Sequence, residues 1–169
     1  GKKLDILERT NQFEVGNVSK SKKGAWEKIE ATVDSGAADT VGPQKMAKWI
    51  PLQETSASKA GMTYNAAGGE EIKNLGERSL SIVNENGTNG NMTIQVGDKI
   101  NKLLAAVSRI GEAGNKVTFY DDDDRHRITN KATGEITEMY EKNGTFKMDL
   151  WIWNPDAEGA KGFQRQGGY

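Results

Sequence analysis

Short runs of alternating apolar and polar residues predict that most of the chain forms β-strands. The alternation is clear from Trp26 to Val33 and ends at Asp34. A period of two places apolar side chains on one face, as in a strand with one buried side. We expect further strands at residues 72–75 and 80–83, joined near Gly76, and at 92–96, 117–120, 127–129, 136–140 and 145–153.

Turn-forming residues divide these strands from one another. Residues 84–91 are rich in asparagine and glycine, and Asn143-Gly144 lies between two apolar runs. An Asn-Gly pair between strands is a strong hairpin signal. Residues 53–70 are small and polar, which predicts loops or a mobile hairpin.

Two segments have a helical pattern. The first covers residues 44–49, because Pro51 prevents its continuation. The second covers residues 102–113, where four apolar side chains fall on one stripe and Gly114 follows the last turn. Many short strands with one or two short helices indicate a mainly β domain.

Composition restricts the classes of function. The 169 residues include 23 basic and 24 acidic side chains, and 35% of residues are hydrophobic. This length suits one domain with a small core, and the charge balance argues against nucleic acid as a partner. No apolar run approaches the roughly 18 residues needed to span a membrane. The absence of cysteine excludes thiol nucleophiles and thiolate metal sites.

The strongest candidate for chemistry is Asp34-Ser35-Gly36. Two carboxylates about 3 Å apart cannot both ionise, so one can activate a water while the other donates a proton. A carboxylate at a strand end is held rigidly, and Gly36 lets main chain approach it closely. Ser35 can hydrogen-bond to a facing loop, and Ala37 keeps the floor small and apolar.

A single chain carries only one such tripeptide, so the second carboxylate must come from another copy. A two-fold axis would bring two Asp34 side chains together. The same tripeptide also occurs as an ordinary turn, and an unrelated small β-barrel with such a turn remains an alternative.

The residues around this tripeptide resemble the active-site signature of retropepsins, the aspartic proteases of retroviruses and retrotransposons. Residues 33–40 read VDSGAADT, an apolar residue followed by Asp-Ser-Gly-Ala. The following text is similar to the protease segment of copia-type retrotransposon polyproteins. The matching motifs, in order, lie at residues 67–77, 103–110, 114–119 and 143–150, within a resemblance that covers about residues 25 to 151.

The resemblance implies a closed β-barrel, retropepsin-like and mainly β, with one or two short helices and extra C-terminal β-hairpins. We divide the chain into a retropepsin-like core at 23–120 and a hairpin extension at 121–153, and the residue pattern predicts an N-terminal arm at 1–22 and a flexible tail at 154–169. The sequence departs from the retropepsin family at Ala38, where retroviral relatives usually carry a second aspartate, and at Ala105, where many carry glycine.

The resemblance also implies residue roles in a homodimeric aspartic endopeptidase. Asp34 would be catalytic, Ser35 would join the two loops, and Gly36 would bind the substrate main chain. Side chains and flap positions that border the peptide would be Ala37, Asp39, Tyr64, Ala67, Gly68 and Gly69. The substrate would be a peptide or a retroelement polyprotein, in the cytoplasm or within a retroelement particle. No cofactor and no metal are expected; a non-catalytic binding or assembly module of the same fold is the alternative.

Two further features are interpreted as structural. Four consecutive aspartates at residues 121–124 cannot all converge on one cation, so we expect an exposed acidic loop. His126 is the single histidine, which excludes a histidine-based zinc site within one chain, and we expect it at the surface.

Overall fold

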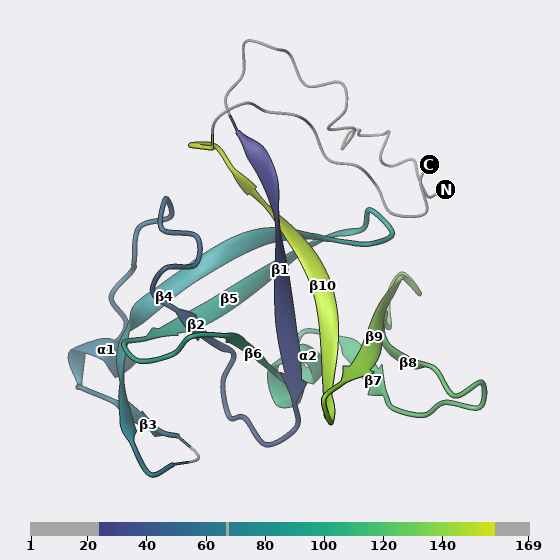
Figure 1. The fold of residues 1–169 in the computed structure, drawn as a ribbon, viewed down its shortest axis with the longest axis horizontal. Coiled ribbons are helices and arrows are strands. Elements are labelled where there is room, and N and C mark those ends of the chain that lie inside the picture. Colours follow the sequence, from purple (N-terminus) through teal and green to yellow (C-terminus); the bar gives the residue numbers. More distant parts are fainter. Residues whose placement is uncertain (1–23, 67, 158–169) are drawn as a thin grey trace.

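The computed structural model describes residues 24–66 and 68–157, and it is mainly β, which confirms the expected class. Two short helices accompany the strands (Figure 1). The elements are β1 (Ala25–Asp34), β2 (Val41–Pro43), α1 (Ser56–Lys59), β3 (Thr63–Asn65), β4 (Glu71–Asn84), β5 (Asn89–Gly97), β6 (Leu103–Ala106), α2 (Val107–Glu112), β7 (Asn115–Thr118), β8 (His126–Asn130), β9 (Ile136–Lys142) and β10 (Thr145–Asn154).

The strands follow the order β3-β4-β5-β2-β6-β1-β10-β9-β8-β7, and β4 also pairs with β10. Because of this added pairing, six strands (β4, β5, β2, β6, β1 and β10) are linked in a continuous cycle. Strands β7, β8 and β9 continue from β10 as antiparallel neighbours (Figure 1).

Strand β1 lies between two partners that come from late in the chain. It pairs antiparallel with β10, with Ala25 opposite Asn154 and Val33 opposite Phe146. On its other edge it pairs parallel with β6, with Asp34 opposite Ala106. The end of β1 is therefore held from both sides.

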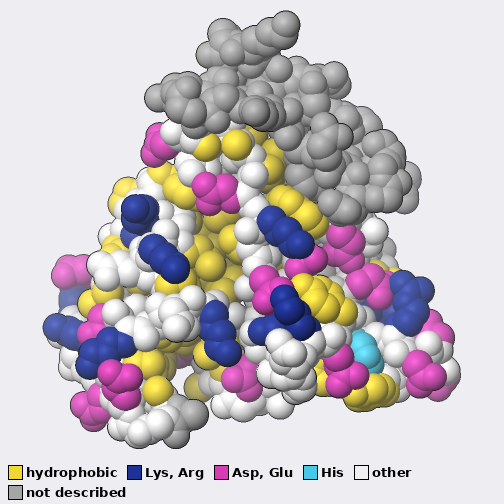
Figure 2. Space-filling view, viewed as in Figure 1, with side chains coloured by type: hydrophobic (Ala, Val, Ile, Leu, Met, Phe, Trp, Pro, Cys, Tyr) yellow, Lys and Arg dark blue, Asp and Glu magenta, His cyan; other side chains and the backbone are white. Residues whose placement is uncertain are grey.

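The core is built mostly from side chains of the strands in the cycle, together with Ile128 of β8, Met139 of β9 and Ala47. On β4 the buried positions alternate with exposed ones along most of the strand, as a period of two requires. The largest fully buried apolar side chains are Leu80, Ile94, Leu103, Leu150 and Val96. On the face drawn in Figure 2, charged side chains of both signs are interspersed.

Most of the strands expected from the sequence are present, and the Asn143-Gly144 hairpin between β9 and β10 is confirmed. The segment 53–70 contains a hairpin, as expected, because β3 pairs with the start of β4. It also contains α1, which the sequence did not indicate; Thr55 caps this helix by accepting a hydrogen bond from the Ser58 N–H at 3.1 Å. The N-terminal arm at 1–22, and the tail from residue 158 on, lie outside the described residues.

The two strands expected at 72–75 and 80–83 form one strand, β4. The register against β5 shifts between Asn74 and Gly76, so a local irregularity replaces the expected break. Gly76 has φ +129°, and Gln53 pairs with Glu77 beside it. Glycine adopts this conformation readily, so the chain continues as a strand.

Replacing Gly76 by alanine is expected to lower the free energy of unfolding by about 2 kcal/mol or more. A Cβ there would lie 2.6 Å from the Gln53 carbonyl oxygen, at a positive φ. Urea unfolding monitored by circular dichroism measures the loss. The matched control is Gly111→Ala in α2, where nothing lies within 4 Å of an added Cβ. Equal stability of the two variants would contradict the prediction.

The helix expected at 44–49 is wrong, because these residues form successive turns. Arg78 binds these turns. Its Nε donates to the Ile50 carbonyl at 2.6 Å, and its Nη1 donates to the carbonyls of Gln44 and Met46 at 2.9 and 3.0 Å. Ala47 has φ +57°, which interrupts a right-handed helix, and Arg78 satisfies the carbonyls that the turns leave without main-chain partners.

The single helix expected at 102–113 is also wrong. Its first part, Leu103–Ala106, is strand β6, and only Val107–Glu112 is helical. Leu103 and Ala105 are fully buried. Pairing with β1 buries this segment in the core, so tertiary packing overrides a local pattern that also fits a helix.

Candidate functional site

Asp34 is the last residue of β1 and begins a turn. Its side chain is half-buried, whereas Ser35 and Gly36 are exposed and Ala37 is half-buried. The Gly36 N–H donates to Asp34 Oδ1 at 2.8 Å. In the described chain this is the side chain's one hydrogen bond, so the second oxygen, Oδ2, makes none.

Thr40 attaches the turn to the strand beside it. Its hydroxyl accepts a hydrogen bond from the Ala106 N–H at 3.1 Å, and its carbonyl accepts one from the Gln95 N–H at 2.8 Å. Because Ala106 also lies opposite Asp34 in the parallel pairing of β1 and β6, both ends of the turn are fixed to one residue. The turn therefore holds the carboxylate at a defined position.

Asp39 is held by an arginine from α2. Arg109 donates from Nε at 2.8 Å and from Nη2 at 2.6 Å, both to Asp39 Oδ1. Arg109 Nη1 also contacts Glu112 at 2.9 Å. The Asp39 side chain is 19% exposed and that of Arg109 is 51% exposed, so the pair lies at the surface with its acidic partner partly shielded.

Tyr64 on β3 lies within the electrostatic reach of this ion pair. Burial raises the pKa of the Tyr64 phenol most, and the Asp39 charge adds to the rise. A hydrogen bond from Asn74 and the Arg109 charge act in the opposite direction. The charges of Asp39 and Arg109 thus act on the Tyr64 phenol in opposite directions, while its hydrogen bond comes from Asn74.

A chain of hydrogen bonds fixes Tyr64 to the sheet. The buried Asn74 donates from Nδ2 to the Tyr64 hydroxyl at 2.9 Å and to Gln95 Oε1 at 3.1 Å. Gln95 Nε2 in turn donates to Glu77 Oε1 at 3.0 Å. The amide oxygen of Asn74 accepts from the Gly76 N–H at 2.8 Å. Asn74 thus couples the β3–β4 hairpin to the irregularity in β4.

The other expected flap residues lie at the turn of the β3–β4 hairpin. Gly68 and Gly69 are exposed, and the Gly69 N–H donates to the Ala66 carbonyl at 2.9 Å. Ala67 lies outside the described residues. The structure brings Asp34 together with Gly36. Among the described residues it shows no contact between Asp39 and Tyr64, and none between the hairpin turn and Asp34.

Arg109, Thr40 and Asn74 position this region, and reasoning from the sequence missed all three as site residues. Arg109 contacts a residue 70 positions away, and Thr40 contacts one 66 positions away. No local pattern signals such a partner. The one sequence signal for the Arg109–Asp39 pair is a basic residue just after an apolar run, in a chain that also carries a turn with aspartate.

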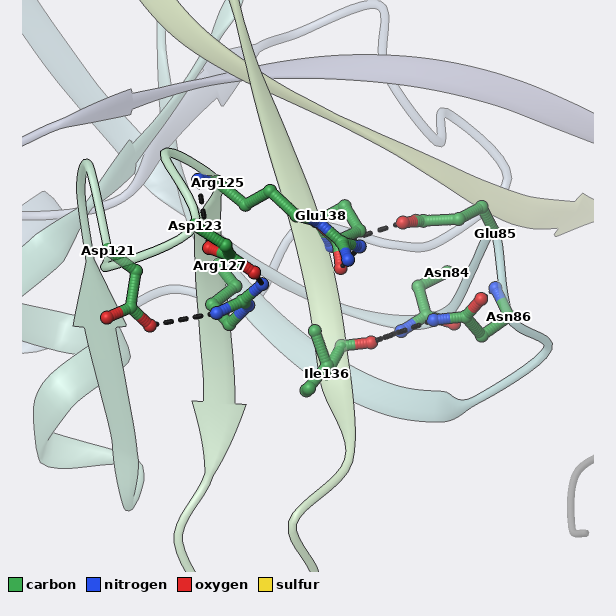
Figure 3. A network of polar contacts seen from close by, with 9 residues as sticks. All are labelled: Asn84, Glu85, Asn86, Asp121, Asp123, Arg125, Arg127, Ile136 and Glu138. Atoms are coloured by element: carbon green, nitrogen blue, oxygen red, sulfur yellow. Dashed lines mark hydrogen bonds and ion pairs between the residues drawn. The ribbon is translucent and has the colours of Figure 1, made fainter.

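The acidic run at residues 121–124 is partly paired. Asp122, Asp123 and Asp124 are exposed, as expected. Arg127, however, donates from Nη1 to Asp121 Oδ2 at 2.8 Å and from Nη2 to Asp123 Oδ2 at 2.7 Å (Figure 3). The hydrogen bond from Arg127 lowers the pKa of Asp123. Within residues 24–66 and 68–157, no three acidic or histidine side chains are grouped so as to hold a metal ion.

His126 is buried, so its expected place at the surface is wrong. It is 9% exposed, and its ring lies 4.9 Å from that of Phe146 and 4.5 Å from that of Tyr120. Its Nδ1 accepts a hydrogen bond from the Tyr120 N–H at 2.9 Å. An apolar setting with one satisfied nitrogen indicates a structural role.

Glu85 is a partly buried carboxylate beside the same network (Figure 3). Its Oε2 accepts from the Glu138 N–H at 3.1 Å, and its buried Oε1 has no hydrogen-bond partner among residues 24–66 and 68–157. Burial raises the pKa of Glu85 above its ordinary value, and the charges of Glu138 and Asp149 add to the rise. The folded protein therefore holds its proton to higher pH than the unfolded chain does.

Replacing Glu85 by glutamine is expected to stabilise the protein at pH 8 by about 1 kcal/mol, and to have little effect at pH 4. A raised folded-state pKa means that the stabilising contribution is complete below the unfolded value and is lost as pH rises through the folded one. The neutral amide avoids that loss. Urea unfolding across this pH range measures the difference, with exposed Glu54→Gln as the control. A difference independent of pH would contradict the prediction.

Comparison with protein-family models, curated proteins and solved structures found no match for this chain. Among the described residues, no helix has the length and apolar character needed to cross a bilayer.

Proposed function

We propose that the protein is a retropepsin-like aspartic endopeptidase that acts as a homodimer and cleaves a peptide or retroelement polyprotein. The observation that carries the proposal is the setting of Asp34. It ends a strand that is held on both edges, and it begins a turn in which Gly36 donates to its carboxylate. A fixed, half-buried carboxylate with one oxygen uncommitted is what a shared-proton pair requires.

The arrangement of strands supports the proposal at the level of the fold. The cycle of pairings through six strands fits a closed β-barrel. The parallel pairing of β1 and β6 puts the Asp34 turn against the start of α2, which follows β6 directly. The β3–β4 hairpin, with Tyr64 fixed by Asn74, fits a flap that closes over a bound peptide.

The proposed mechanism needs two chains. Two Asp34 carboxylates across a two-fold axis share one proton. The ionised carboxylate takes a proton from a water whose oxygen attacks the scissile carbonyl carbon, and the protonated one donates to the carbonyl oxygen. The C–N bond then breaks, and the leaving amine takes a proton from the carboxyl pair. Ser35 joins the facing turns, and the Gly36 main chain binds the substrate. Ala37 and Asp39, with Tyr64, border the peptide; the proposed flap also includes Gly68, Gly69 and Ala67. Such an enzyme would work in the cytoplasm or within a retroelement particle.

The test measures mass and activity in one sample. Sedimentation is expected to give twice the chain mass of 18.5 kDa. Unfolded casein at pH 5 and at pH 7 serves as substrate, and a statine-type transition-state analogue is expected to inhibit its cleavage. A serine-protease inhibitor is the control and should leave cleavage unchanged. A chain that remains monomeric and never cleaves at either pH would support a non-catalytic binding module.

A further inference from the structure

A groove of about 690 Å³ lies between β5 and the α2–β9 part of the chain. This volume lies within the range of ligand-binding cavities, roughly 300–1,000 Å³. The groove begins at Asp39 and Thr40, beside the Asp34 turn, and reaches Asn84 and Thr137 at its other end. Asp34 does not line the groove, so a peptide bound there need not be the segment that is cleaved.

One wall of the groove is a strand edge without a partner. Strand β5 pairs with β4 along its whole length, but β2 covers only Gln95–Gly97 on the opposite edge. The Gln95 N–H points away from β4, because it donates to the Thr40 carbonyl. Main-chain groups alternate in direction along a strand, so those of Asn91 and Thr93 point the same way. In the described chain nothing bonds to them.

The side chains of the two walls form an apolar hollow next to this edge. Met92 and Ile110 are half-buried there, and Ile128, Met148 and Leu150 are buried, with 2–8% exposed. A strand added beside β5 would lie about 4.8 Å from it and direct every second side chain into this hollow. The hollow therefore favours apolar residues at alternate positions.

The charged side chains of the groove leave one unpaired carboxylate in the described chain, that of Glu135. Asp39 and Arg109 neutralise each other. Glu135 lines the groove and makes no ion pair in the described chain, and its Oε1 accepts from the Thr133 hydroxyl at 3.2 Å. A lysine or arginine in the occupant would complement Glu135.

We propose that this groove binds an extended peptide, which adds as a strand to β5 at Asn91 and Thr93. It places apolar side chains in the hollow and a basic side chain near Glu135. Main-chain hydrogen bonds supply affinity and the hollow supplies selectivity, as in other cases of strand addition. A folded second copy fits less well, because residues of α2 and β7 line the groove opposite this edge, where the neighbouring strands of that copy would have to lie.

The probe is a fluorescein-labelled octapeptide of alternating valine and threonine with lysine at both ends, titrated by fluorescence anisotropy. The protein carries Asp34→Asn, so that cleavage does not remove the probe. Thr93→Pro is expected to weaken binding about tenfold, because proline removes an N–H that β4 does not use. Ser79→Ala is the matched control, because it removes the Ser79–Thr93 side-chain contact of 3.2 Å and keeps the N–H.

Two further experiments leave strand β5 unmodified. Two peptides are N-methylated at alternate residues, one at the odd positions and one at the even positions, and at least one of them is expected to bind about tenfold more weakly. Glu135→Gln is expected to remove the preference for the lysine peptide over one with alanine at both ends, whereas Glu54→Gln should keep it. These experiments decide the outcome if Thr93→Pro does not fold.

Equal affinity for all peptides, or no effect of N-methylation in either peptide, would overturn the proposal. So would a dimer that Thr93→Pro dissociates, because a second copy would then occupy the edge. The groove does not depend on the proposed catalysis. If the peptide binds but the unmodified protein does not cleave casein, the groove proposal stands and the peptidase proposal is rejected. If casein is cleaved but the peptide does not bind, the peptidase proposal stands and the groove proposal is rejected.

Discussion

Replacing Asp34 by asparagine is expected to abolish peptide cleavage while the domain stays folded. Asparagine has nearly the same shape, and its side-chain oxygen can still accept the hydrogen bond that the Gly36 N–H now gives at 2.8 Å. It cannot take a proton from water at neutral pH, so general-base catalysis is lost. We expect a fall in the cleavage rate of about 10⁴-fold or more.

Casein cleavage measures the rate, and circular dichroism with sedimentation measures fold and mass. The matched control is Asp122→Asn, an exposed carboxylate to which no side-chain contact is assigned in the described structure. It should cleave like the unmodified protein. Cleavage by Asp34→Asn at the normal rate, in a sample freed of other proteases, would reject the proposed chemistry.

Mixing the unmodified chain with the Asp34→Asn chain distinguishes an active site shared by two chains from one formed within a single chain. If each site needs two Asp34 carboxylates, an equal mixture that has exchanged subunits contains about a quarter of fully competent dimers. Activity at constant total chain would then be about 25% of that of the unmodified protein. A site within one chain would give about 50%. The second result would contradict the homodimer even if Asp34 is catalytic.

Replacing Arg78 by methionine is expected to lower the free energy of unfolding by about 3–5 kcal/mol, enough to unfold many small domains. Arg78 is 6% exposed and donates to three carbonyls of the 44–50 segment. Methionine fills similar space but leaves these acceptors without donors in a largely dry place. No other side chain of the described chain bonds to them.

Urea unfolding at pH 7 measures the loss, and hydrogen exchange should show that amides of residues 44–50 lose protection first. Arg125→Met is the matched control, since the Arg125–Glu138 pair is at the surface and its removal should cost under about 1 kcal/mol. The free energy of unfolding of Arg78→Lys should lie between those of the unmodified protein and Arg78→Met, because one ammonium cannot reproduce the several N–H donors of a guanidinium. Equal stability of Arg78→Met and Arg125→Met would refute the anchoring role.

Alternation in the sequence predicted β1, β9 and β10, and turn chemistry predicted the Asn143-Gly144 hairpin between the last two. Burial alternates most clearly on β4, whereas β1 and β10 each bury three consecutive residues near their ends. The sequence pattern failed at residues 102–113, because Leu103 and Leu104 fit a helix stripe as well as a buried strand. Only the pairing with β1, about 70 residues away, decides between them.

The candidate site was predictable to a similar degree. Asp34 at a strand end and a hairpin within residues 53–70 follow from local pattern. Its supports do not, because Arg109 reaches Asp39 and Asn74 reaches Gln95 across the fold. The groove beside β5 was also unpredictable, because a strand edge is unpaired only in relation to all the other strands. Local rules identify a candidate carboxylate, and long-range contacts position it.

The pairing of β1 with β10 has a consequence for the timing of synthesis. Glu27 lies opposite Ile152, so the strand that ends in Asp34 receives its antiparallel partner 125 residues later. Ribosomes add about 5–20 residues per second, so about 6–25 s separate the emergence of the two strands. During that interval the nascent chain carries the Asp34 turn without the strand that fixes it. A peptidase of this topology would gain activity only after its last strand has emerged from the ribosome.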